Sequence, residues 1–115
     1  MKKDPTIFIN HILECIERIQ DYTAGVSQDE FLSSPQIQDA VMRRIEVIGE
    51  AVKKLNPEVK DKHPEIPWKR VAGMRDTLIH DYFGVDLKLT WKVATEDIAE
   101  LKRNISAVRN GLGKD

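Results

Sequence analysis

Four side chains that can bind anions or move protons fall within one short segment of this chain. They are Arg75, Asp76, His80 and Tyr82. The imidazole of His80 has an unperturbed pKa close to neutrality, so it can take and return a proton at physiological pH. The guanidinium of Arg75 can present two parallel donors to phosphate or carboxylate oxygens. The set therefore suits proton transfer beside a bound anion.

The same residues also have a purely structural interpretation. A histidine near the end of a helix can satisfy the last carbonyl groups and interact favourably with the helix dipole. Arg75 and Asp76 can form a surface ion pair of small worth, and Tyr82 can be an ordinary aromatic at the edge of the core. Spacing alone leaves both interpretations open.

Helical geometry limits how these side chains can meet. At about 100° per residue, Asp76 and His80 differ by about 40° and can hydrogen-bond, whereas Arg75 and His80 diverge by about 140°. Arg75 and Tyr82 share another line along the helix. One straight helix therefore does not aim Arg75 and His80 at one point. We expect two copies of the helix, related by a two-fold axis, to bring them into a shared cleft.

Start and stop signals predict four helices that would position this segment. The first begins at Asp4-Pro5 and fades at Gly25, and the second runs from Ser34-Pro35 to Asn56-Pro57. The third opens at Pro67-Trp68 and stops near Phe83-Gly84, where the glycine suits a left-handed cap. The fourth is capped by Asp86 and ends at Gly111.

The connections between the first three helices are expected to be loops, over residues 26–34 and 57–67. Phe31 and Leu32 in the first loop should lie against the core. In the second helix, apolar residues recur at helical spacing and leave Arg43, Arg44, Glu46 and Glu50 off the main stripe. No segment shows the alternation of a half-buried strand. Residues 1–115 therefore predict a single all-α domain, an antiparallel four-helix bundle.

The overall charge does not favour sequence-independent binding of nucleic acid. The chain has 115 residues, a formal net charge of -1 and a pI of about 6.3. Nonspecific binding rests on many contacts from Lys and Arg to phosphates, so a nucleic-acid role would need a local basic surface. Lys69 and Arg70, close to Arg75, are the best candidates for such contacts.

Metal sites, cofactor sites and membrane segments have no clear sequence signal. The histidines His11, His63 and His80 lack metal-binding spacing, and phosphate-cradling glycine loops are missing. We therefore expect no metal and no cofactor, and assign no role to His11 or His63. Cys15 is the only cysteine and is expected to be buried. No long apolar run or leader pattern is found, so a cytoplasmic protein is expected.

The segment resembles a known family. Arg75, four residues, His80, one residue and Tyr82 match the Arg-x4-His-x-Tyr motif of HEPN-domain ribonucleases, in particular the HepT-like toxins encoded beside an MntA-like minimal nucleotidyltransferase antitoxin. The likeness covers nearly the whole chain. It includes Gln38–Val41 and Ile48–Ala51 of the second helix, Pro67-Trp68, and the stretch Tyr82–Asp86 with Trp91 following.

The resemblance implies a HEPN-like fold, a homodimer and metal-independent cleavage of RNA. Arg75 and His80 would be catalytic, Asp76 would help hold the site, and Tyr82 would be the tyrosine that the antitoxin modifies with AMP. Cleavage through the 2′-hydroxyl would leave a 2′,3′-cyclic phosphate and would exclude DNA as substrate. An AMP on Tyr82 would add bulk and negative charge beside Arg75 and inactivate the toxin.

Two other functions stay open at this point. The chain can be a non-catalytic helical module that binds a nucleotidyltransferase or a nucleotide, with Arg75 and His80 as phosphate ligands. The near-neutral charge favours this second view slightly. A third option is a helical scaffold whose polar residues stabilise only a dimer interface.

Overall fold

A capping side chain followed by proline begins each of the two longest helices, as the sequence predicts. In the computed structural model, which describes residues 4–80 and 84–112 except for the side chain of His80, α1 spans Pro5–Thr23 and α3 spans Pro35–Lys54. The Asp4 carboxylate accepts a hydrogen bond from the backbone of Thr6, and the Ser34 hydroxyl accepts one from Ile37. These bonds satisfy amide groups that have no partner inside the helix.

Both segments expected to be loops contain a short helix, so that prediction was wrong. Helix α2 spans Gln28–Leu32 and α4 spans Pro57–Lys62. A reciprocal pair of bonds between Ser27 and Glu30 forms a capping box on α2, which stabilises one helical turn without a long apolar stripe. Phe31 is fully buried and Leu32 packs partly buried on the core, as expected.

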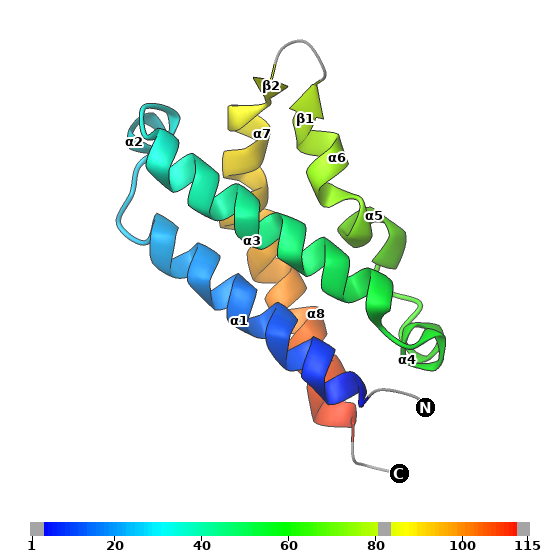
Figure 1. Cartoon of the computed structure of the whole chain (residues 1–115). Helices are drawn as coiled ribbons and strands as arrows, with labels where there is room; N and C mark the ends of the chain where they lie inside the picture. The colour runs from blue at the N-terminus through cyan, green and yellow to red at the C-terminus, as the bar shows by residue number, and fades with distance from the viewer. Residues whose placement is uncertain (1–3, 81–83, 113–115) are drawn as a thin grey trace.

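The third helix is broken and ends earlier than predicted. Helix α5 spans Trp68–Ala72 and α6 spans Met74–Leu78. The chain then forms strand β1, Ile79–His80, which pairs antiparallel with β2, Gly84–Val85. Figure 1 shows this hairpin projecting beyond α6 and α7 at one end of the molecule.

Three local features explain why the helix stops at Leu78. Ile79 has an extended backbone, with φ -106° and ψ 127°. The backbone amide of Asp86 donates to the Leu78 carbonyl over 2.7 Å, which takes up a carbonyl that a continuing helix would use. Gly84 has φ +75°, in the left-handed region that favours glycine. This glycine therefore serves the hairpin rather than a helix cap.

The fourth predicted helix is present from Asp86 to Gly111 but is not uniform. Helix α7 spans Leu87–Lys92, a π-helical segment η1 spans Val93–Asp97, and α8 spans Ile98–Gly111. The Asp86 carboxylate accepts from the Leu89 amide at 3.0 Å, which confirms the predicted cap. The wider π turn lets the adjacent Val93 and Ala94 both reach the core.

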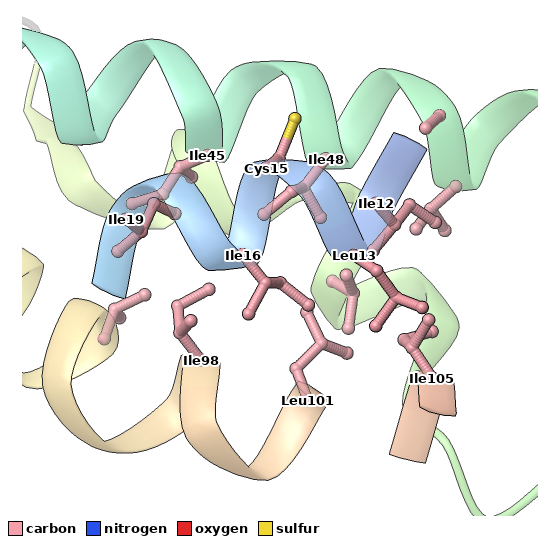
Figure 2. Close-up of a cluster of buried hydrophobic side chains, with 14 of the residues drawn as sticks. Ile12, Leu13, Cys15, Ile16, Ile19, Ile45, Ile48, Ile98, Leu101 and Ile105 are labelled. Atoms are coloured by element: carbon pink, nitrogen blue, oxygen red, sulfur yellow. The ribbon is translucent and has the colours of Figure 1, made fainter. Parts of the chain in front are cut away.

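Helix α1 provides the centre of the core, because it packs against both α3 and α8. Figure 2 shows isoleucine side chains of all three helices meeting between them, with Ile16 facing Ile98 and Leu101. Cys15 belongs to this core and is 1% exposed, as the sequence predicts. Helices α1 and α3 lie side by side in opposite directions (Figure 1). The all-α fold class is therefore confirmed.

No helix in the described ranges is long and apolar enough to cross a membrane.

Candidate active site around Arg75

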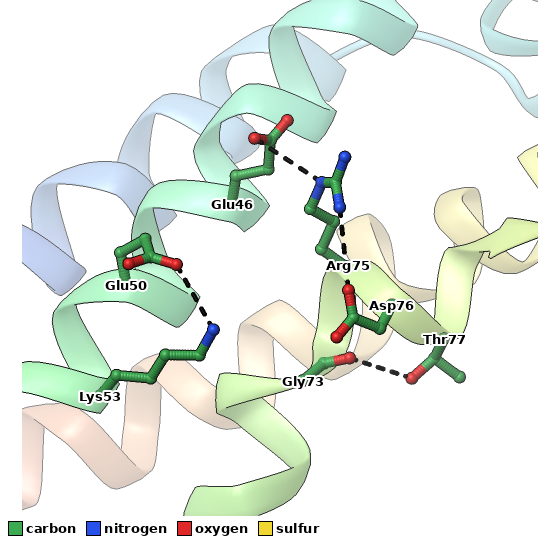
Figure 3. A network of polar contacts seen from close by, with 7 residues as sticks. All are labelled: Glu46, Glu50, Lys53, Gly73, Arg75, Asp76 and Thr77. Carbon is green, nitrogen blue, oxygen red and sulfur yellow. Dashed lines mark hydrogen bonds and ion pairs between the residues drawn. The ribbon is translucent and has the colours of Figure 1, made fainter.

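Arg75 lies on α6 with its guanidinium between two carboxylates. Its Nε is 3.6 Å from Glu46 Oε2 of α3, and its Nη1 is 3.7 Å from Asp76 Oδ1. Both distances fit ion pairs and are longer than direct hydrogen bonds. The side chain of Arg75 is 48% exposed, so it can still be reached from solvent. Figure 3 shows the guanidinium standing in the space between α3 and α6.

A close approach of two helices places Arg75 beside Glu46. Gly49 lies one turn beyond Glu46 on α3 and is buried against the end of α5. A Cβ added at Gly49 would be 2.9 Å from the carbonyl oxygen of Ala72, closer than real Cβ contacts allow. The missing side chain therefore lets α5 and α6 pack close to α3.

Arg75 lines a groove of about 400 Å³. It runs between α1, α3 and the α5–α6 segment and mixes charges of both signs. The basic residues in its lining are Arg43, Lys53, Lys54 and Arg75, and the acidic ones are Glu46, Glu50 and Asp76. Because acidic residues also line the groove, an anion can bind there only beside one of these basic side chains.

The structure separates several residues that the sequence placed together. Because α6 ends at Leu78, Asp76 and His80 do not share a helical face, and the predicted helical alignment of these two residues was wrong. The predicted alignment of Arg75 with Tyr82 involves a residue, Tyr82, that lies outside the described residues. The described part of His80 is its backbone, opposite Gly84 in the hairpin. The helical angle therefore gives no reason for a two-chain cleft.

Lys69 and Arg70, the predicted RNA-contact residues, are exposed on α5 but do not line the groove around Arg75. They line a second, more open hollow of about 850 Å³ beside α4. Lys53 and Ala72 line both hollows, so the two adjoin. The basic residues Arg75, Lys53, Lys69 and Arg70 therefore lie along two adjoining hollows that also contain acidic residues.

Two residues at this groove have no counterpart in the sequence prediction. Glu46 contacts Arg75, although its position off the apolar stripe indicated only a solvent-facing residue. His11 of α1 lines the groove, whereas no role is assigned to it from the sequence. His63 lies elsewhere, with Nδ1 3.2 Å from a Glu65 carboxylate oxygen. The only available signal for Glu46 was its place one turn before a glycine in a helix.

The described side chains include no group of three or more His, Cys, Asp or Glu residues placed to hold a metal ion.

The thiol of Cys15 is buried in the core. Burial raises the pKa of the Cys15 thiol, and the Arg44 guanidinium, 3.9 Å from its sulfur, opposes that shift. A thiol with a raised pKa stays protonated at neutral pH and is a poor nucleophile.

The arrangement around Arg75 suits stabilisation of negative charge. Its partly exposed guanidinium can donate to two oxygens of one phosphate, and the flanking carboxylates restrict its orientation. One helical turn and a short strand connect Arg75 to His80 along the chain. Helix α6 therefore carries a guanidinium that an anion can reach from solvent.

Comparison with known proteins finds one family and several relatives whose names include RNase or ribonuclease. Residues 12–108 match the family described as ribonuclease HepT-like. A protein of Methanocaldococcus jannaschii named "Gamma-glutamylcyclotransferase and putative RNase" is 52% identical over 115 residues, all of this chain and 52% of its own length. The chain thus spans about half of that relative.

Two further relatives match over nearly their full lengths. A "Putative RNase" of the same organism is 43% identical over 99% of this chain and 95% of its own length. The "Probable ribonuclease HepT" of Thermococcus cleftensis is 43% identical over 95% of this chain and 99% of its own length. No solved structure matches the chain.

Proposed function

Because the chain belongs to the ribonuclease HepT-like family, we propose that it is a metal-independent endoribonuclease toxin with Arg75 and His80 as catalytic residues. The observation that carries this proposal is the Arg75 guanidinium, half exposed in a groove and held by carboxylates, one short connection before His80. Asp76 is the supporting residue, because its carboxylate lies beside Arg75 Nη1.

Each residue has a defined task in the proposed reaction. The 2′-oxygen of a ribose attacks the adjacent phosphorus, the bond to the 5′-oxygen breaks, and a 2′,3′-cyclic phosphate and a 5′-hydroxyl result. His80 moves a proton from the 2′-hydroxyl or to the leaving 5′-oxygen. Arg75 donates to the phosphoryl oxygens, where negative charge increases in the transition state. A substrate without a 2′-hydroxyl cannot follow this route, so DNA is not cut.

Lys69 and Arg70 are proposed to contact the RNA backbone beyond the cleavage point. Their hollow adjoins the groove of Arg75 through Lys53 and Ala72, so a strand leaving the groove can continue along α5. Such contacts bind phosphates without reading sequence, and they weaken as salt increases. Replacing both residues by alanine should therefore weaken binding and make it less dependent on salt.

Control of the toxin is proposed to rest on Tyr82 and on a partner protein. An MntA-like minimal nucleotidyltransferase antitoxin would attach AMP to Tyr82, two residues beyond His80, and the toxin would act as a homodimer. These parts of the proposal come from the resemblance in the Arg-x4-His-x-Tyr motif. The added phosphate would repel an RNA phosphate from the Arg75 groove.

The first experiment compares cleavage of purified RNA by the wild type, His80→Ala and His11→Ala. We expect His80→Ala to slow cleavage by about a hundredfold or more, because it removes the proton-transfer group. His11→Ala is the matched control, since His11 lines the same groove but has no proposed role. Activity should persist in EDTA and leave cyclic phosphate ends. Loss of activity in His11→Ala alone would move the acid–base role to α1.

Equal RNA integrity with the wild type and His80→Ala would remove the enzyme function. Binding of nucleotide without cleavage would then favour the non-catalytic module, with Arg75 and His80 as phosphate ligands.

The second experiment tests control by modification. The chain is incubated with ATP and an MntA-like nucleotidyltransferase, and the site of AMP is located by mass spectrometry. We expect one AMP on Tyr82 and none on Tyr82→Phe, with loss of cleavage only in the modified wild type. Tyr22, the other tyrosine of the chain, is partly buried against the core and serves as the comparison. Equal rates for modified and unmodified protein would contradict the proposed control.

A further inference from the structure

We propose that Glu46 is a positioning residue for Arg75: its carboxylate fixes the Nε edge of the guanidinium so that the opposite side faces the substrate phosphate. This inference rests on the proposed ribonuclease function, and it assigns a role to a residue outside the Arg-x4-His-x-Tyr motif. Glu46 does not touch the substrate in this scheme. It acts through the orientation of Arg75.

The three nitrogens of the guanidinium face different surroundings. Nε lies 3.6 Å from Glu46 Oε2 and Nη1 lies 3.7 Å from Asp76 Oδ1. Figure 3 draws these two contacts, and neither of them involves Nη2. A guanidinium is planar, so two contacts on different nitrogens restrict its rotation as well as its place. The terminal end of the guanidinium, opposite Nε, can then bind an anion without first changing rotamer.

Glu46 is the more sheltered of the two carboxylates. Its side chain is 34% exposed, whereas that of Asp76 is 80% exposed. Water and salt screen an exposed pair more than a sheltered one, so the contact with Glu46 should hold Arg75 more firmly. Asp76 is also the neighbour of Arg75 on one short helix, so it moves with it. Glu46 belongs to the long helix α3 and ties Arg75 to the core of the fold.

A purely electrostatic role for Glu46 predicts the opposite effect on activity. A carboxylate beside Arg75 reduces the positive potential that attracts RNA, so removing it would strengthen binding. A positioning role predicts that removal slows the chemical step, because the guanidinium then samples other orientations. The direction of the change therefore distinguishes the two roles.

Glu50 offers a matched control on the same helix. It lies one turn after Glu46, lines the same groove and pairs with Lys53 at 3.4 Å instead of with Arg75. Its removal changes the charge of the groove by the same amount. A difference between Glu46→Ala and Glu50→Ala thus reports on Arg75 and not on charge.

The experiment measures single-turnover cleavage of a defined RNA by the wild type, Glu46→Ala, Glu46→Gln, Asp76→Ala and Glu50→Ala. We expect Glu46→Ala to lower the rate at saturating RNA by about 10- to 100-fold, a loss typical of a misplaced catalytic group. Glu46→Gln should recover part of the rate, because the amide oxygen can still accept from Nε. Asp76→Ala should lose less than Glu46→Ala, and so should Glu50→Ala, which changes the charge of the groove by the same amount. The melting temperature of each variant should stay within about 3 °C, since exposed ion pairs contribute little stability.

A double-mutant cycle shows whether Glu46 acts through Arg75. Lysine in place of Arg75 keeps the charge but has no Nε edge, so Glu46→Ala should have almost no further effect in the Arg75→Lys background. A readout independent of activity is the proton NMR signal of Arg75 Nε–H, assigned by its loss in Arg75→Lys. That signal should exchange faster with water in Glu46→Ala than in the wild type or Glu50→Ala.

Three results would overturn the role of Glu46. They are unchanged or increased cleavage by Glu46→Ala, equal losses in Glu46→Ala and Glu50→Ala, and full additivity with Arg75→Lys. Failure of the ribonuclease function would look different, because then the wild type and His80→Ala would both leave the RNA intact. The exchange rate of the Arg75 Nε–H would still report on the contact with Glu46 in that case.

Discussion

Arg75 is both accessible to solvent and close to oppositely charged groups. It keeps about half of its surface exposed, yet two carboxylates from different helices lie within ion-pair distance of its guanidinium. At the residue scale, a guanidinium that is accessible and restrained in orientation is suited to binding an anion.

The identity of residue 75 as arginine should therefore matter beyond its charge. We expect Arg75→Lys to reduce RNA cleavage by at least about tenfold, because an ammonium is a point charge and lacks the planar guanidinium that presents one edge to Glu46 and another to two phosphoryl oxygens. The measurement is the single-turnover rate at saturating RNA. Arg103→Lys, at an exposed position on α8, is the control. A rate for Arg75→Lys equal to that of the wild type would mean that charge alone suffices.

The packing of α5 against α3 controls the site at the element scale. Gly49 is the point of closest approach, since an added Cβ would meet the Ala72 carbonyl oxygen at 2.9 Å. The obstacle is backbone and cannot rotate out of the way. Any larger residue at this position must push α5 outward, and α6 with Arg75 follows α5 directly.

We expect Gly49→Ala to lower the free energy of unfolding by about 1–3 kcal/mol, the usual cost of overpacking. Cleavage should fall as well, because Arg75 moves away from Glu46. Chemical denaturation and the cleavage rate are measured on the same samples. Gly111→Ala is the control, because a Cβ added there meets nothing within 4 Å. A Gly49→Ala protein as stable and active as the Gly111→Ala protein would contradict the close approach.

At the scale of the whole molecule, each chain has one groove lined by Arg75. The association of two chains into a dimer is part of the proposed function. Helical angles no longer support a cleft shared by two chains, because Arg75 and His80 are not on one helix. The resemblance to dimeric toxins is what supports it. The question is whether Arg75 of one chain works with His80 of the other.

Complementation between inactive variants answers this question. Arg75→Ala and His80→Ala chains carrying different tags are co-expressed, and the mixed dimer is purified. If each active site takes Arg75 and His80 from different chains, one of the two sites is intact, and we expect about half of the wild-type activity. Light scattering checks the mass of the dimer. An inactive mixed dimer would place both residues of each site in the same chain, and a monomer would remove the shared cleft altogether.

Local signals in the sequence determined much of the fold. Asp4 and Ser34 with their following prolines, the cap at Asp86 and the apolar spacing of α1, α3 and α8 each act within a few residues, so they can be read without a structure. The hairpin after Leu78 was missed because Gly84 suits a helix cap and a hairpin equally, as both use a positive φ. Only the bond from Asp86 to Leu78 decides between them.

The sequence by itself identified Arg75 and His80 as a motif and Arg75 as the anion-binding group of a helical domain. The tertiary structure decided what surrounds Arg75. Glu46 lies far from it along the chain, and their contact depends on how closely α3 and α5 pack at Gly49. The distance between Glu46 and Arg75 cannot be predicted from local sequence patterns, because it results from the packing of two separate helices on a common core.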